Sequence, residues 1–351
     1  YNLGLDWGVL NNRLTGSFEY YIRDTKNMVG KAPDLPSLLG TDVPKTNNTD
    51  LRTSGWELSI GWNDRLANGI AYGAKFNIYD SRTKITRYPN NPTNSIDSYI
   101  AGCYTGEIWG YTTIGLAKTN EEMQQHLASL PNGGQDAIGS SWAAGDIMYA
   151  DINGDGKIDG GTGRLGDTGD RIIIGNSASR YMFGLDLNAS WQGFDLRIFF
   201  QGVGKRDYWQ GSYVMFGSNS SGQWHCSGLE AVHDYFRDEN TWSVKEGYQT
   251  ANTDAYLPRP LWNDKNLRTQ SRYLQNAAYI RMKNLQIGYT LPKKITTRWN
   301  IENMRLFFSG ENLFTITSLD KQFDPETLNG GYGGNAYPLS KTISCGLSVT
   351  L

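Results

Sequence analysis

The sequence predicts an all-β chain that forms the C-terminal portion of an antiparallel transmembrane β-barrel and supplies about nine of its wall strands. Apolar and polar residues alternate in repeated segments of roughly ten residues, which is the length of a barrel strand. Short turns and long connections also alternate along the chain, so the long connections fall at one end of an antiparallel meander. Aromatic residues lie near several strand ends, where a barrel wall meets water.

The clearest pair of strands runs from Tyr181 to Gly202. Every second residue of its first half is apolar, and the same pattern resumes after Gln192-Gly193, so a tight turn is predicted there. The apolar residues are Tyr181, Phe183, Leu185, Leu187, Ala189 and Trp191, followed by Phe194, Leu196, Ile198 and Phe200. The two runs are therefore expected to pair as a hairpin with one apolar face.

The same pattern predicts the other wall strands. In chain order these are 3–9, 14–22, 56–62, 70–78, 280–289, 305–314 and 343–351. A phase slip at Lys283-Asn284 predicts a β-bulge, because one extra residue reverses the alternation. The segment 305–314 is apolar on both sides, so its alternation does not define which face is turned outward. Long loops are predicted at about 81–179 and 204–278.

The overall composition excludes some classes of function. A net charge of -2, a pI near 6.0 and the lack of a Lys/Arg-rich run argue against nucleic acid as a partner. The sequence contains no run of about 18 apolar residues, so no transmembrane helix is predicted. No catalytic triad, phosphate loop or trustworthy pair of catalytic carboxylates stands out, so the chain is not expected to be an enzyme. Cys103 and Cys226 fall in the long loops and could pair in an oxidising compartment.

The segment Asp151–Asp159, DINGDGKID, has the spacing of a calcium-binding loop. Oxygen ligands recur at alternate positions, and a glycine at the sixth position allows a sharp turn. The candidate ligands are Asp151, Asn153, Asp155, the carbonyl of Lys157, and Asp159. Thr162 stands where an EF-hand has glutamate, so Asp167 or Asp170 would have to complete the shell. The alternative is an acidic, glycine-rich surface turn.

Aromatic residues in the long loops are the remaining candidate for a binding function. Exposed aromatic rings stack on sugars and other flat apolar surfaces. The predicted substrate-binding residues are Trp109, Tyr111, Trp209 and Trp224. Long loops also need small cores of their own, so packing is the competing role for each of these rings.

Several motifs, in order, resemble the SusC/RagA-like TonB-dependent outer-membrane transporters of Bacteroidetes. They are GDIMYADINGDGKID, GDRIIIGNSASRYMFGLDLNASWQGFDLRIFFQGVGKRDYW, YIRMKNLQIGYTLP, RLFFSGENLFTIT, FDPE and the terminal strand. The resemblance covers nearly the whole chain. It departs from the family pattern at Ser179, where proline is usual, and at Leu351, where an aromatic residue is usual.

The resemblance implies that residues 1–351 are the C-terminal part of one barrel of about 22 strands, with the signal peptide, plug and N-terminal strands outside this sequence. It also implies active import of oligosaccharides, a SusD-like surface lipoprotein as partner, and energy from the TonB-ExbB-ExbD complex. Three alternatives stay open. They are import of peptides by the same fold, a secreted calcium-binding carbohydrate-binding β module, and a glycoside hydrolase.

Overall fold

The computed structural model describes residues 1–30, 38, 40, 44–211, 213–216, 230–329 and 336–351. Its main element is a ten-stranded antiparallel sheet with the order β1-β2-β3-β4-β9-β10-β13-β14-β16, and β15 pairs with β13 beside β14. These strands are β1 Asn2–Val9, β2 Leu14–Gly30, β3 Thr46–Arg65, β4 Ala71–Arg87, β9 Arg180–Trp191, β10 Phe194–Lys205, β13 Tyr279–Thr290, β14 Asn303–Glu311, β15 Thr315–Thr317 and β16 Thr342–Thr350.

Smaller elements occupy the connections between these wall strands. The short strands are β5 Glu107–Gly110, β6 Thr113–Leu116, β7 Ile147–Tyr149, β8 Ile172–Asn176, β11 Asp207–Tyr208 and β12 Gln275–Asn276. The helices are α1 Asn120–Ala128, α2 Tyr213–Phe216, α3 Trp242–Lys245 and α4 Lys293–Thr296, with 3-10 turns at Glu230–His233 and Thr297–Trp299. Among the described residues, no helix is long and apolar enough to cross a membrane.

The predicted hairpin and bulge are confirmed in the wall. Strands β9 and β10 pair with Trp191 opposite Phe194, and Gln192 and Gly193 both adopt positive φ in the turn between them. Along the pair β10–β13, Phe199 lies opposite Asn284 whereas Phe200 lies opposite Met282. Lys283 is therefore the extra residue of a bulge, as the phase slip predicts.

The two faces of the sheet differ in polarity, as a barrel wall requires. Large apolar side chains of the outermost strands, among them Leu3, Leu5, Ile343 and Leu347, are exposed. On the other face, the carboxylate of Asp195 on β10 pairs with the guanidinium of Arg305 on β14 at 2.5 Å. That ion pair passes over Gly288 of the intervening β13, where a Cβ atom would lie about 2.4 Å from Arg305. Arg305 thus assigns the polar face of β14, which the sequence left undefined.

The strands are longer than the sequence predicts at the end where the long connections lie. β2 continues to Gly30, and β4 continues to Arg87, so the first long connection begins after 87 rather than at about 81. Polar residues form these extensions, and their ladders carry ion pairs such as Arg52 with Asp24 at 2.7 Å. Alternation of apolar residues does not mark the extensions because neither face of this part needs to be apolar.

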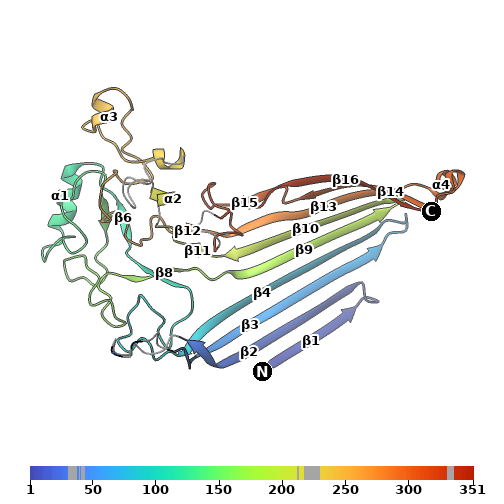
Figure 1. Ribbon diagram of the computed structural model, residues 1–351, viewed down its shortest axis with the longest axis horizontal. Helices are drawn as coiled ribbons and strands as arrows, with labels where there is room; N and C mark the ends of the chain where they lie inside the picture. The colour runs from blue at the N-terminus through green and yellow to red at the C-terminus, as the bar shows by residue number, and fades with distance from the viewer. Residues whose placement is uncertain (31–37, 39, 41–43, 212, 217–229, 330–335) are drawn as a thin grey trace.

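The parts of the long connections 88–179 and 206–278 that the structure describes gather at one end of the sheet, opposite α4 (Figure 1). The main hydrophobic core lies in these connections and not in the wall. It contains Met123, Ile147, Tyr149, Ile158 and Tyr273, each of which is fully buried or nearly so. It extends to Leu319, Phe323 and Leu328 of a third connection, the one between β15 and β16. The loops are therefore a folded unit with a core shared by three connections.

Candidate functional site

Three of the four predicted substrate-binding aromatic residues lie in the described part of the chain. Trp109 is partly buried on β5, Tyr111 is buried just after that strand, and Trp209 follows β11. Trp224 lies outside the described residues, as does Cys226, so the predicted pairing of Cys226 with Cys103 is untested. Trp209 packs on Phe216 at a ring distance of 6.2 Å against the loop core. This contact gives Trp209 a packing role.

Trp109 and Tyr111 line the same cavity, which we call the Trp109 hollow. Its volume is about 480 Å³, and it is enclosed by Ser95, Asp97, Trp109, Gly110, Tyr111, Ala137, Ile138, 160–163, Arg171, Arg268 and Thr269. A second cavity of about 470 Å³ adjoins it and shares Trp109 and Asp97. Volumes of this size suit small-molecule or oligomer-unit ligands. The hollow is built from both long connections, so its shape depends on how they pack together.

Local backbone irregularities orient the two rings. In the pair β5–β8 the register shifts between Ile108 and Trp109, and a bulge of this kind redirects the side chains that follow it. Tyr111 is then held by the second long connection. Its amide donates to the carbonyl of Thr269 at 2.8 Å, and its carbonyl accepts from the amide of Ser271 at 3.0 Å. Because only Gly110 separates the two rings, they lie on the same side of the extended chain and line one hollow.

Glycine residues leave room for a guanidinium in the hollow. Arg171 donates from Nη2 to the carbonyl of Gly160 at 3.0 Å. A Cβ atom on Gly160 would lie 3.2 Å from that guanidinium and 3.3 Å from the hydroxyl of Tyr111. Residues 160–163, which line the hollow, directly follow DINGDGKID in the chain. The acidic loop and the hollow are therefore joined through this short segment of backbone.

The loop at Asp151–Asp159 is closed by hydrogen bonds within the chain. Asp151 accepts from the amides of Gly154 at 2.7 Å and Gly156 at 2.9 Å. Lys157 donates from Nζ to Asp159 at 2.6 Å. Asn153 and Asp155 accept from the amides two residues on. Within the described residues, no group of three or more His, Cys, Asp and Glu side chains converges as a metal site. The side chains as arranged thus do not form a ready calcium shell.

Asp170, one of the two residues considered for completing the shell, lies under this loop and is fully buried. Its carboxylate accepts from the amides of Ile152 at 2.8 Å and Asp159 at 2.9 Å. Burial raises the pKa of Asp170, and the nearby negative charge of Asp151 acts in the same direction, against the hydrogen bonds from the backbone. Asp167, the other residue considered, accepts from the amide of Thr162 at 3.1 Å instead.

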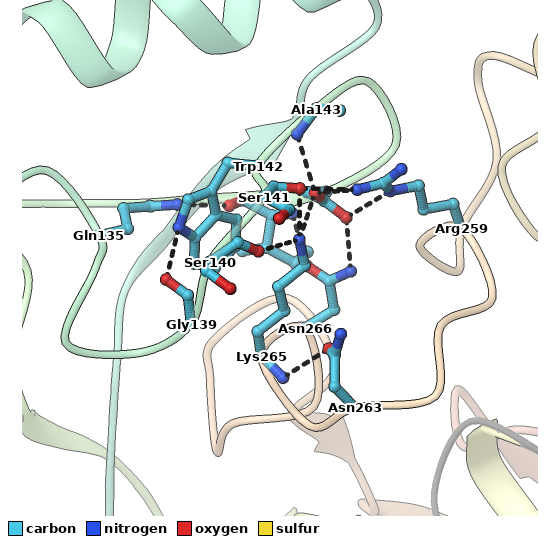
Figure 2. A network of polar contacts seen from close by, with 12 residues as sticks. Gln135, Gly139, Ser140, Ser141, Trp142, Ala143, Arg259, Asn263, Lys265 and Asn266 are labelled. Atoms are coloured by element: carbon cyan, nitrogen blue, oxygen red, sulfur yellow. Dashed lines mark hydrogen bonds and ion pairs between the residues drawn. The ribbon is translucent and has the colours of Figure 1, made fainter.

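A buried polar network around Asp146 connects the two long connections. Figure 2 shows its members Trp142, Arg259 and Lys265. The carboxylate of Asp146 is fully buried and accepts two hydrogen bonds from Arg259, each at 2.7 Å. Lys265 Nζ donates to it at 2.8 Å, and Asn266 Nδ2 at 2.9 Å. Lys265 also lies 4.5 Å from the centre of the Trp142 ring. Sequence reasoning missed this network, because residues 146 and 259–266 carry no common motif.

Opposing effects act on the charges of the network. Burial alone would raise the pKa of Asp146, but hydrogen bonds from Arg259, Asn266 and Lys265 hold the pKa below its ordinary value. Burial lowers the pKa of Lys265, and Asp146 opposes that shift. The ionised carboxylate is therefore favoured, and it fixes residues of the second long connection against residues 140–146 of the first.

The known proteins that are similar to this chain in sequence are TonB-dependent receptors. No protein-family model matches the chain. The TonB-dependent receptor P3 of Formosa agariphila is 27% identical over 99% of the chain, and the TonB-dependent receptor SusC of Bacteroides thetaiotaomicron is 23% identical over 99%. The chain spans 33% and 31% of these two proteins, about a third of each.

The fold agrees with that similarity. A solved structure of the RagAB peptide transporter superposes with a TM-score of 0.69 and 22% identity, and the match covers 99% of this chain and 34% of that one. A RagAB peptide importer in a closed state gives a TM-score of 0.68 with 22% identity, over 99% of this chain and 35% of that one. The predicted barrel fold and the predicted resemblance are thereby confirmed. The chain thus resembles the SusC/RagA-like TonB-dependent receptors over 99% of its length, and it has the fold of the matching part of their outer-membrane β-barrel, with both wall and loops.

Proposed function

We propose that the receptor containing this chain imports oligosaccharides across the outer membrane. The observation that carries the proposal is the Trp109 hollow, in which an aromatic ring, guanidinium groups and glycine backbone line one cavity at the loop end of the wall. Sugar rings present apolar faces that stack on aromatic side chains, and hydroxyl groups that need hydrogen-bonding partners. A cavity lined by both kinds of group suits one or two sugar units.

The proposed energy source is the TonB-ExbB-ExbD complex, and the proposed partner is a SusD-like surface lipoprotein. The names of the relatives support TonB dependence, since P3 and SusC are both TonB-dependent receptors. The long connections, which we propose to be extracellular, would face that lipoprotein. In this scheme substrate is held between lipoprotein and loops, and the loop core keeps the Trp109 hollow in a fixed shape during transfer into the barrel.

Import of peptides is the second candidate. The chain has the fold of RagAB, whose structures are described as those of a peptide transporter and importer. Arginine side chains in the hollow would donate hydrogen bonds to the carboxylates of a peptide as readily as to those of a sugar. The partly buried ring of Trp109 lines the hollow and favours sugars, because stacking on a flat ring gives little selectivity for an extended peptide backbone.

The test is uptake by cells that carry the receptor with Trp109 changed. Trp109→Ala removes the stacking surface, whereas Trp109→Phe keeps an aromatic face and serves as the matched control. We expect Trp109→Ala to reduce oligosaccharide uptake about fivefold or more, taking as a guide the about 1–3 kcal/mol that stacking of a nucleic-acid base on an aromatic side chain contributes. Trp109→Phe should retain most of it. Equal uptake by both variants and the unchanged receptor would contradict the role of the hollow.

A calcium ion at Asp151–Asp159 is a further proposal that concerns structure and not transport. Its support is the alternation of oxygen donors and the raised pKa of Asp170, whose carboxylate lies near that of Asp151. A cation there would favour the ionised form of both acids. Binding would require the ion pair between Lys157 and Asp159 to open, and the carboxylates that now accept backbone amides to turn toward the ion.

A further inference from the structure

The charged side chains of the Trp109 hollow indicate which oligosaccharides it binds. Two guanidinium groups, those of Arg171 and Arg268, and one carboxylate, that of Asp97, line the cavity. We propose that the hollow binds the carboxylate of a uronic acid, so that the imported oligosaccharides are acidic. This inference rests on the proposed function and narrows its substrate class.

Arg171 has hydrogen-bonding capacity that its protein contacts do not use. Its Nη2 donates to the carbonyl of Gly160, and its Nη1 lies 3.6 Å from Asp97, which is beyond hydrogen-bonding distance. Its Nε is buried and has no acceptor among the described residues. This Nε is too deeply buried for a ligand in the hollow to reach, so the N–H groups left for a ligand carboxylate are those on Nη1 and the second one on Nη2. Arg171 is thus prepared for an acceptor that the chain does not provide.

The charges opposite the two arginines are weakly held. The side chain of Asp97 is 76% exposed, and Asp264, which lies 3.0 Å from Arg268, is 70% exposed. Exposed ion pairs of this kind contribute little, because water competes for both partners. A ligand carboxylate can therefore replace them at small cost. The planar fork of a guanidinium binds a carboxylate with two parallel hydrogen bonds, which a neutral hydroxyl cannot match.

The uncharged surfaces of the hollow favour a sugar as the carrier of that carboxylate. Trp109 supplies a flat apolar surface, and 160–163 supplies backbone without large side chains apart from Thr162. A pyranose ring can lie on the indole while a carboxylate on its edge reaches the arginines. A peptide carboxylate would contact the arginines alone, without stacking on Trp109. The Trp109 ring therefore favours the sugar acid over the peptide.

The binding experiment uses the purified full-length receptor with its lipoprotein, in detergent, and isothermal titration calorimetry. The probes are trisaccharides of galacturonate, glucuronate and mannuronate, the methyl ester of each, neutral maltotriose, and the tripeptide Gly-Gly-Glu. We expect at least one uronate to bind, and its methyl ester to bind about tenfold or more weakly, because esterification removes the charge. The double variant Arg171→Gln/Arg268→Gln should lose the preference for the acid.

Two control variants separate charge recognition from folding and from general electrostatics. Arg171→Lys keeps the charge but not the fork, so it should retain only part of the preference. Arg164→Gln removes an exposed arginine close in sequence that does not line the hollow, and it should bind as the unchanged receptor does. The inference is overturned if no uronate binds, if acid and ester bind equally, or if the tripeptide alone binds.

Uptake by whole cells distinguishes failure of this inference from failure of the proposed function. Cells lacking the receptor are complemented with the unchanged gene or with the double variant, and uptake of labelled acidic and neutral oligosaccharides is measured. Equal uptake of acidic and neutral oligosaccharides by both complemented strains would leave the proposed function intact and reject the acidic preference. If the unchanged gene restores no oligosaccharide uptake, the proposed function itself is rejected.

Discussion

Removal of the Asp146 carboxylate should loosen the attachment between the two long connections. In the variant Asp146→Ala, Lys265 keeps its buried position, with only 3% of its side chain exposed, but it loses its counter-ion. Its remaining partners are the carbonyls of Ser140 and Ser141 at 3.0 Å and the ring of Trp142. Stranding a buried charge in this way costs about 3–5 kcal/mol. The cost falls on local opening of the loops, because the wall has its own hydrogen-bonded ladder.

Hydrogen exchange of the intact receptor measures this opening directly. The informative amides are those of Ile147, which donates to Asn266, and of Tyr149, which donates to Gln135. A loss of about 3 kcal/mol corresponds to exchange about a hundredfold faster. Asp254→Ala is the matched control, because Asp254 forms only an exposed ion pair with Lys118 and should cost less than about 1 kcal/mol. Exchange of both amides within about fivefold of the unchanged receptor in Asp146→Ala would refute the reasoning.

Three further predictions concern the wall, pH and calcium. Gly288→Val should displace the Arg305–Asp195 pair above it, and this overpacking should cost about 1–3 kcal/mol. The barrel should then lose its heat-modifiable migration in gels at a lower temperature. An unchanged temperature contradicts this prediction. Because the pKa of Asp146 is depressed, its stabilisation should be complete above about pH 3.9 and be lost as pH falls below that value, seen as faster proteolysis of the loops. A chelator should increase proteolysis at DINGDGKID if calcium binds near Asp170; equal cleavage with and without calcium contradicts the ion.

The wall could be predicted from the sequence because a barrel strand has a short repeat with a physical cause. Alternation places every second side chain toward lipid, so apolar residues such as Leu185, Leu187 and Ala189 identify β9 without any knowledge of its partners. The bulge at Lys283 follows from the same rule, since one extra residue reverses the pattern. The rule fails where both faces meet water, and for that reason the ends of β2 and β4 were missed.

The site could be predicted only in part. Trp109 and Tyr111 are candidates because exposed aromatic rings in loops stack on sugars, yet nothing in the sequence shows that Arg268 lies in the same hollow, about 160 residues further along the chain. The Asp146 network was missed for a related reason. Lysine and arginine are usually exposed, and only the folded loops reveal that Lys265 is buried against a carboxylate. Contacts between distant segments leave no local periodicity to detect.

The central proposal is tested most directly by uptake of a labelled oligosaccharide mixture into cells with and without the receptor, in the presence and absence of TonB. We expect uptake only when both receptor and TonB are present, with acidic oligosaccharides enriched inside the cells relative to neutral ones. Uptake that is independent of the receptor or of TonB would contradict it. Receptor-dependent uptake of peptides without any uptake of oligosaccharides would reject oligosaccharide import and favour import of peptides instead.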